Sequence, residues 1–295
     1  MSRRQSPSAG ADFLPRRVET LRESFQEKMR QRGSQRAAKA REDRSEVRFL
    51  EMAHGPHPDV DHLNDRFLPG SPRLRVTLDV LGLDLHSDGI PPALVPNLLE
   101  IFPRLERHRC CGGDDVHSSL LTRWRHGESA SPPGDRALDF CHLLEHVTLE
   151  LMRGMVPSAP CAGITCAYRE PPHRFDLFIE CEDARVGAAA LRCAAHLLLA
   201  LIQAGRPPAG SFRYAETARY FLGRPRSILN PGEVLASLQG DPPRLQEALR
   251  FLAEAGFLVE DQFTADFGET ILYRYRLAPA LPPLPISLPL PDRSA

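Results

Sequence analysis

The sequence predicts an α+β protein, in which a two-layer domain of helices on an antiparallel sheet is followed by a small winged-helix-like module. Three observations lead to this prediction. Short segments of alternating apolar residues indicate strands, and apolar residues spaced three and four apart indicate helices. These elements follow one another in the order of a two-layer domain. The 295 residues, 42% hydrophobic and 25% charged, suffice for two small domains with their own cores.

The chain begins with a basic segment. Residues 1–48 hold 13 Arg or Lys against 7 Asp or Glu, with few large apolar side chains. Such a composition buries too little apolar surface to fold, so we expect 1–70 to be a disordered basic N-terminal arm. Contact with nucleic acid or an acidic partner is the alternative use of such an arm. Apolar spacing also allows a short helix at 17–30.

The α+β domain is predicted at 71–206. A strand is indicated at 74–80, where apolar and polar residues alternate. A strong helix is indicated at 137–153, where apolar residues recur on one face and Gly154 provides a stop. The other predicted elements are a helix from Pro91 or Pro92 to about 107, a short helix at 120–124, strands at 164–169 and 175–181, and a helix at 183–204.

The winged-helix-like module is predicted at 211–278. Two short helices, ending near Leu238 and Ala255, precede a hairpin, which is the layout of a winged helix. The presumed recognition helix carries Arg244 and Arg250, but it also carries acidic residues and makes a poor phosphate-binding face. We therefore expect a protein partner or structural closure here and no nucleic acid. A Pro/Leu-rich extended tail is predicted at 279–295.

The cysteines indicate a reducing compartment. There are seven, an odd number, and the basic N-terminus is not followed by the apolar segment of a signal peptide. Free thiols and a cytoplasmic location are therefore expected. The longest apolar run, at 193–202, is interrupted by His196 and is too short to span a bilayer, so no membrane association is expected.

One motif on the helix at 137–153 can carry chemistry. His142 and His146 are four residues apart, so both imidazoles lie on one helix face and can chelate one zinc ion. Glu145 completes the order H-x-x-E-H, in which the carboxylate accepts a proton from a zinc-activated water. The competing interpretation is an ordinary helix whose histidines are solvated or hydrogen-bonded.

A catalytic zinc needs a third protein ligand and an open position. Glu180, at the end of the strand at 175–181, is favoured because a ligand from a neighbouring element can close a three-sided site. Glu150 lies one further helical turn after His146 and would then orient that histidine. His86 and His108 are the two other histidines whose distance from the motif should be checked in the structure.

The stretch around the motif resembles the N-terminal domain of cyanophycin synthetases over about 74–205. The matching pieces are Asp88-Gly-Ile-Pro91, Phe102-Pro-Arg-Leu105 with His108 and Cys110, Trp124-Arg-His-Gly127, the decamer from His142 to Leu151, and Leu177-Phe-Ile-Glu-Cys181 before an Ala/Leu-rich helix. In some members that domain is similar to a metallopeptidase and trims an Asp/Arg polymer.

The resemblance implies that His142 and His146 bind metal, that Glu145 is the base, and that Glu150 and Glu180 are acidic family positions. This chain also departs from the family. It has no ATP-grasp glycine-rich loop and no P-loop, so it is not a polymer synthetase by itself. In addition, a loop at 127–135 is inserted before the motif helix.

Together these features predict a zinc-dependent peptidase or amidohydrolase acting on a peptide or isopeptide-like substrate, with the Asp/Arg polymer as one candidate. The first alternative is a non-catalytic adaptor that binds a peptide, or a protein through its C-terminal module. The second alternative is a DNA-associated regulator, based on the basic arm and the winged-helix-like layout.

Overall fold

The structure, a computed structural model, describes residues 46–81, 93–108, 136–160, 162–264, 271–279 and 286–289. The arm up to residue 45, the helices expected at 17–30 and 120–124, the loop at 127–135, and His86 lie outside these residues.

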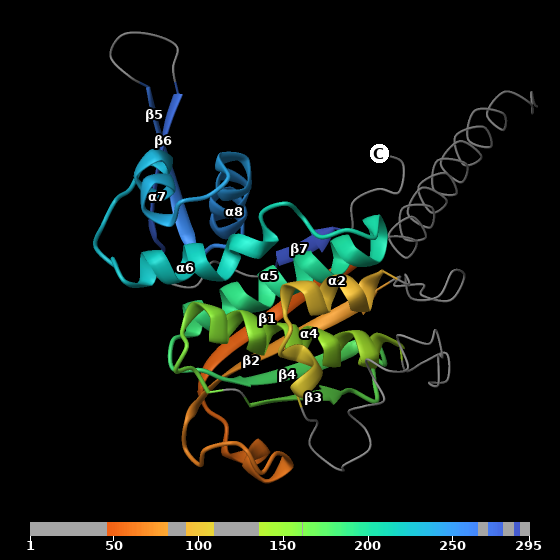
Figure 1. Ribbon diagram of the computed structural model, residues 1–295. Coiled ribbons are helices and arrows are strands. Elements are labelled where there is room, and N and C mark those ends of the chain that lie inside the picture. The colour runs from red at the N-terminus through yellow and green to blue at the C-terminus, as the bar shows by residue number, and fades with distance from the viewer. Residues whose placement is uncertain are drawn as a thin grey trace, which may run out of the picture. The chain divides into compact units, whose positions relative to one another are not determined.

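The predicted α+β class is confirmed. One antiparallel sheet has the strand order β3-β4-β2-β1-β7 (Figure 1). Its strands are β1 (Glu46–Pro56), β2 (Pro72–Leu81), β3 (Gly163–Ala167), β4 (Arg174–Glu180) and β7 (Ile286–Pro289). β2, β3 and β4 correspond to the three strands expected from alternating residues.

The sheet includes residues that the sequence led us to place in the N-terminal arm. Residues 46–70, which we predicted as part of the disordered arm, form β1 and the 3-10 helix η1 (Pro58–Leu63). Val47 and Phe49 are fully buried, while charged neighbours alternate with them and obscure the strand in the sequence. The predicted extended tail also contributes β7, which pairs with the start of β1.

Two long helices cover one face of the sheet (Figure 1). They are α4 (Arg136–Met155), which carries the H-x-x-E-H motif, and α5 (Ala184–Ala204). Asp183 caps α5 through the backbone N–H of Arg185, and Gly205 ends it with a φ of 64°. By length and composition α5 could cross a membrane, but 78% of its most apolar stretch is buried inside the fold.

The helix after Pro92 is shorter than expected. We predicted it to continue to about 107, but α2 (Leu94–Ile101) ends before Phe102. Pro103 follows, and a proline disfavours the helical conformation of the residue before it. After this break, the short 3-10 helix η2 (Leu105–Arg107) leads to His108, so the early end of α2 determines where this histidine lies.

The C-terminal part has the order of a winged helix. Its elements are α6 (Tyr214–Leu222), α7 (Pro231–Leu238), α8 (Pro242–Glu254), β5 (Leu258–Thr264) and β6 (Ile271–Leu277). Asn230 and Glu233 form a reciprocal capping box at α7, as the motif Asn-Pro-Gly-Glu suggests. An isolated bridge between Leu229 and Tyr275 adds a third segment beside the β5–β6 hairpin. α6 was not predicted.

This part shares its core with the α+β domain. His196 of α5 and Phe251 of α8 have ring centroids 3.9 Å apart, and Arg192 Nη1 donates to the Ala255 carbonyl at 2.7 Å. On α4, Gly154 allows close approach of α6, because a Cβ there would lie 2.6 Å from that of Ala215. One continuous cluster of buried side chains therefore includes residues of both parts.

Candidate metal-binding and catalytic site

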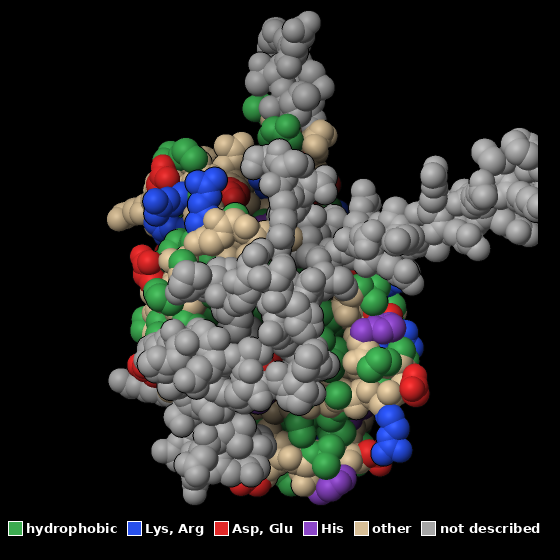
Figure 2. Space-filling view, turned by 90° about the vertical axis from the view of Figure 1, so that its right-hand side faces the viewer, with side chains coloured by type: hydrophobic (Ala, Val, Ile, Leu, Met, Phe, Trp, Pro, Cys, Tyr) green, Lys and Arg blue, Asp and Glu red, His purple; other side chains and the backbone are tan. Residues whose placement is uncertain are grey.

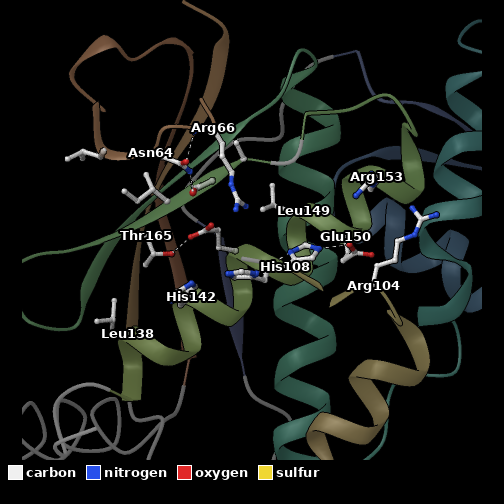
Figure 3. Close-up of a pocket in the computed structure, with 16 residues that line it drawn as sticks. Asn64, Arg66, Arg104, His108, Leu138, His142, Leu149, Glu150, Arg153 and Thr165 are labelled. Carbon is white, nitrogen blue, oxygen red and sulfur yellow. Dashed lines mark hydrogen bonds and ion pairs between the residues drawn. The ribbon is translucent and has the colours of Figure 1, made fainter. Parts of the chain in front are cut away.

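An open cavity of about 720 Å³ lies along one face of α4 (Figure 3). Its walls are Leu63, Asn64 and Arg66 at and just after the end of η1, Arg104 and His108 around η2, and residues 162–165 at β3. The floor is one face of α4, with residues spaced three and four apart as helix geometry requires. These floor residues are Leu138, His142, Glu145, His146, Leu149, Glu150 and Arg153.

Three histidines meet on this floor. The ring centroids of His142 and His146 are 4.8 Å apart, as expected for neighbours one turn apart on a helix. His108 comes from η2, and its ring centroid lies 5.2 Å from that of His146. The Nδ1 atoms of His108 and His146 are 3.1 Å apart. The structure therefore adds His108 to the pair that the motif predicted.

Glu150 holds His108 rather than His146. Its Oε1 atom lies 2.5 Å from Nε2 of His108, and both side chains are largely buried. A histidine that donates one ring N–H to a carboxylate presents the other nitrogen as a lone pair, which is the usual second partner of a metal-binding imidazole. We had expected Glu150 to orient His146, but in the structure its carboxylate pairs with His108 instead.

The donor chemistry of this cluster fits zinc. Two nitrogens bound to one tetrahedral zinc at about 2.0–2.1 Å are roughly 3.3 Å apart, close to the separation of the two Nδ1 atoms. Within the described residues, however, no group of three or more His, Cys, Asp or Glu side chains is already arranged around a metal position. Zinc binding by His142, His146 and His108 is therefore a proposal about side chains that converge on one cavity.

Glu145 is buried beside these histidines. Burial raises the pKa of its carboxyl to about 7, and a hydrogen bond from Thr165 opposes that rise. The Thr165 hydroxyl donates to Oε2 of Glu145 at 2.6 Å. Gly163 leaves space for the carboxylate, since a Cβ there would lie 2.9 Å from Oε1. The strand β3 therefore positions Glu145 in two ways: Thr165 donates a hydrogen bond to it, and Gly163, which has no side chain, leaves room for it.

Glu180 is not part of the cavity. Its carboxylate accepts hydrogen bonds from the backbone N–H of Leu68, at 3.1 Å, and from the hydroxyl of Ser71. Along β4, Phe175, Leu177 and Ile179 join the core with the helices, so Glu180 faces the opposite side of the sheet. The favoured third ligand thus stands across the sheet from α4, on the same side as its neighbour Arg73.

Sequence reasoning missed Thr165 and Gly163 as site residues. Nothing in the sequence of a short strand distinguishes a threonine that supports a carboxylate from one that faces solvent. His108 was noted as worth checking for proximity, and the resemblance places it in a matching segment.

No protein-family model matches this chain, and no curated protein matches it either.

Proposed function

We propose that this protein is a zinc-dependent peptidase or amidohydrolase acting on a peptide or isopeptide-like substrate. The observation that supports the proposal best is the convergence of His142, His146 and His108 beside a buried Glu145 in one open cavity. His108 takes the place of Glu180 as the third ligand. The resemblance to the N-terminal domain of cyanophycin synthetases points to the same chemistry and stays a prediction.

The residues of the cavity would have separate roles in metal binding and proton transfer. The three histidines would hold the ion, and Glu150 would keep the ring proton of His108 on Nε2 by accepting a hydrogen bond from it, which leaves Nδ1 for the metal. A bound zinc lowers the pKa of water and polarises a carbonyl. Glu145 would accept the proton of the attacking water and pass it to the leaving nitrogen, as a carboxylate whose pKa is near neutrality can do.

The edge of the sheet supports a peptide as substrate. In the described sheet β3 is an outer strand, and it pairs with β4 on one side only. The backbone groups of Ala162 and Tyr168 bond to β4, so by alternation those of Thr165 point to the free edge. The Gly163 carbonyl on this edge already accepts a hydrogen bond from Asn64 Nδ2, so an added extended chain would pair with the edge from Thr165 onward, next to the hydroxyl that holds Glu145.

We do not expect the winged-helix part to bind DNA. On α8, Arg244 lies 3.4 Å from Asp241 and Arg250 lies 3.7 Å from Glu254, so acidic neighbours offset both positive charges. Figure 2 shows basic and acidic side chains interspersed on one face of the described residues. A protein partner for this part remains our expectation.

The test is a hydrolysis screen of the zinc-loaded protein against linear peptides and a β-linked Asp/Arg polymer. Glu145→Gln should keep zinc and lower the rate at least about 100-fold, because it removes the general base. Glu182→Gln is the matched control, since Glu182 is exposed and does not line the cavity. Binding of peptides without cleavage, unchanged by Glu145→Gln, would instead identify a non-catalytic peptide-binding adaptor.

A further inference from the structure

Two arginines stand at one end of the cavity, beyond Glu150. Arg104 precedes η2, and Arg153 lies in the last turn of α4 (Figure 3). Both line the cavity and both are exposed. Neither has an ion pair or hydrogen bond with another described residue.

Several other arginines in the described residues pair with a carboxylate across neighbouring elements or at a helix end. Arg75 pairs with Asp176, Arg174 with Asp79, and Arg185 with Asp183. Glu150, the acidic residue labelled in Figure 3 at this end of the cavity, pairs with His108. Two guanidinium groups at one cavity end are thus left without a protein counter-charge among the described residues.

We propose that Arg104 and Arg153 form a subsite that binds a carboxylate group of the substrate. The planar guanidinium matches a carboxylate through two parallel hydrogen bonds. This inference rests on the proposed function for the identity of the ligand as a peptide. It adds that the substrate is acidic at a defined distance from the reacting bond.

That distance follows from the helix. Arg153 is seven residues beyond His146, so its Cα lies about 10 Å further along the axis of α4. An extended peptide advances about 3.4 Å per residue. The recognised carboxylate therefore belongs to a residue about three positions from the reacting bond. It is either an acidic side chain or the C-terminal carboxylate of the substrate.

The experiment measures binding, so that it does not depend on turnover. Three fluorescein-labelled peptides are titrated against the zinc-loaded Glu145→Gln protein by fluorescence anisotropy. They are an alanine hexapeptide amide, the same hexapeptide with a free C-terminus, and the amide with two central aspartates. We expect one of the two carboxylate peptides to bind about tenfold more tightly than the neutral amide, and the tighter one identifies the source of the carboxylate.

Variants of the two arginines test whether they cause the preference for a carboxylate. Arg104→Gln and Arg153→Gln should each weaken binding of the preferred peptide about fivefold, because losing one exposed ion pair changes an affinity by up to about that factor. Binding of the neutral amide should not change. Arg219→Gln, an exposed arginine on α6 outside the cavity, is the matched control. Equal binding of all three peptides, binding of none up to millimolar concentration, or a preference unaffected by both variants would overturn the subsite.

These outcomes are separable from the fate of the proposed function. A carboxylate preference without hydrolysis by the wild-type protein keeps the subsite and removes the peptidase. Hydrolysis without a carboxylate preference keeps the proposed peptidase function and removes the subsite.

Discussion

Nδ1 of His108 lies 3.1 Å from Nδ1 of His146, although the two residues are 38 positions apart. Nε2 of the same His108 ring lies 2.5 Å from Oε1 of Glu150, so both ring nitrogens of His108 have a partner. Two arrangements satisfy this contact. Either one of the two Nδ1 atoms carries a proton and donates it to the other, or both nitrogens face a shared cation. The second arrangement is the one that the proposed zinc site requires.

Glu150→Gln should weaken zinc binding about 10- to 100-fold without abolishing it. The amide accepts the Nε2 proton of His108 less strongly than the carboxylate and makes the ring a poorer ligand. Competition with a chromophoric zinc chelator measures the affinity. Glu180→Gln serves as the control and should leave the affinity unchanged, because Glu180 bonds to Leu68 and Ser71 outside the cavity. The assignment fails if the two variants affect zinc binding equally.

The same Glu180→Gln variant should lower the free energy of unfolding by about 1–3 kcal/mol. The carboxylate is buried and accepts bonds from the Leu68 N–H and the Ser71 hydroxyl, and the amide can leave one of them unsatisfied. Urea unfolding with chelator present isolates this effect from metal binding. An unchanged midpoint would show that these bonds contribute nothing net to the fold.

Gly163→Ala should impair hydrolysis more than zinc binding. The added Cβ would lie 2.9 Å from Oε1 of Glu145 and 3.0 Å from its Cγ, so the carboxylate has to move. A misplaced base lowers kcat, while the histidines keep their positions. We expect at least a tenfold loss of kcat with one zinc per chain retained.

Gly55→Ala is the matched control for this substitution. It adds the same methyl group to a strand glycine with no heavy atom within 4 Å of the new Cβ. Wild-type kcat in Gly163→Ala would contradict the positioning role of this glycine.

Much of the fold was predictable where one face is apolar and the other polar. α4 shows apolar residues at helical spacing over five turns, and α5 is a long run of Ala and Leu whose ends are marked by Asp183 and Gly205. β1 escaped prediction because its buried Val47 and Phe49 alternate with charged residues that resemble the basic arm before them.

The site was predictable only in its local part. Helix geometry alone brings His142, Glu145 and His146 to one face. The positions of His108 and Glu180 depend on long-range packing: the early end of α2 brings His108 to α4, and the alternation of β4 turns Glu180 away. Neither could be read from spacing in the sequence.

His196 should make the metal-free protein lose stability in mild acid. Burial against Phe251, and to a lesser degree Arg250, lowers its pKa from 6.5 to about 4 in the folded protein. The unfolded chain therefore binds a proton at higher pH than the folded one. Stability is complete above pH 6.5 and is lost as pH falls towards 4.

Urea unfolding at pH 7.5 and pH 5 with chelator present measures this loss. We expect His196 to account for about 1–2 kcal/mol of the loss in free energy of unfolding between these two pH values. This is less than the pKa shift alone would give, because the ring is only partly buried. His196→Gln should shrink the acid loss by that amount, whereas His62→Gln, at an exposed histidine, should not. Identical pH dependence in wild type and His196→Gln would refute the assignment.

The central claim is that the three histidines of the cavity hold zinc, and the most direct test is the zinc content of the purified protein by elemental analysis. After equilibration with zinc and removal of excess metal, we expect one zinc per wild-type chain and none in the His142→Ala/His146→Ala variant. No zinc in the wild type, or an undiminished content in the double variant, would contradict the account.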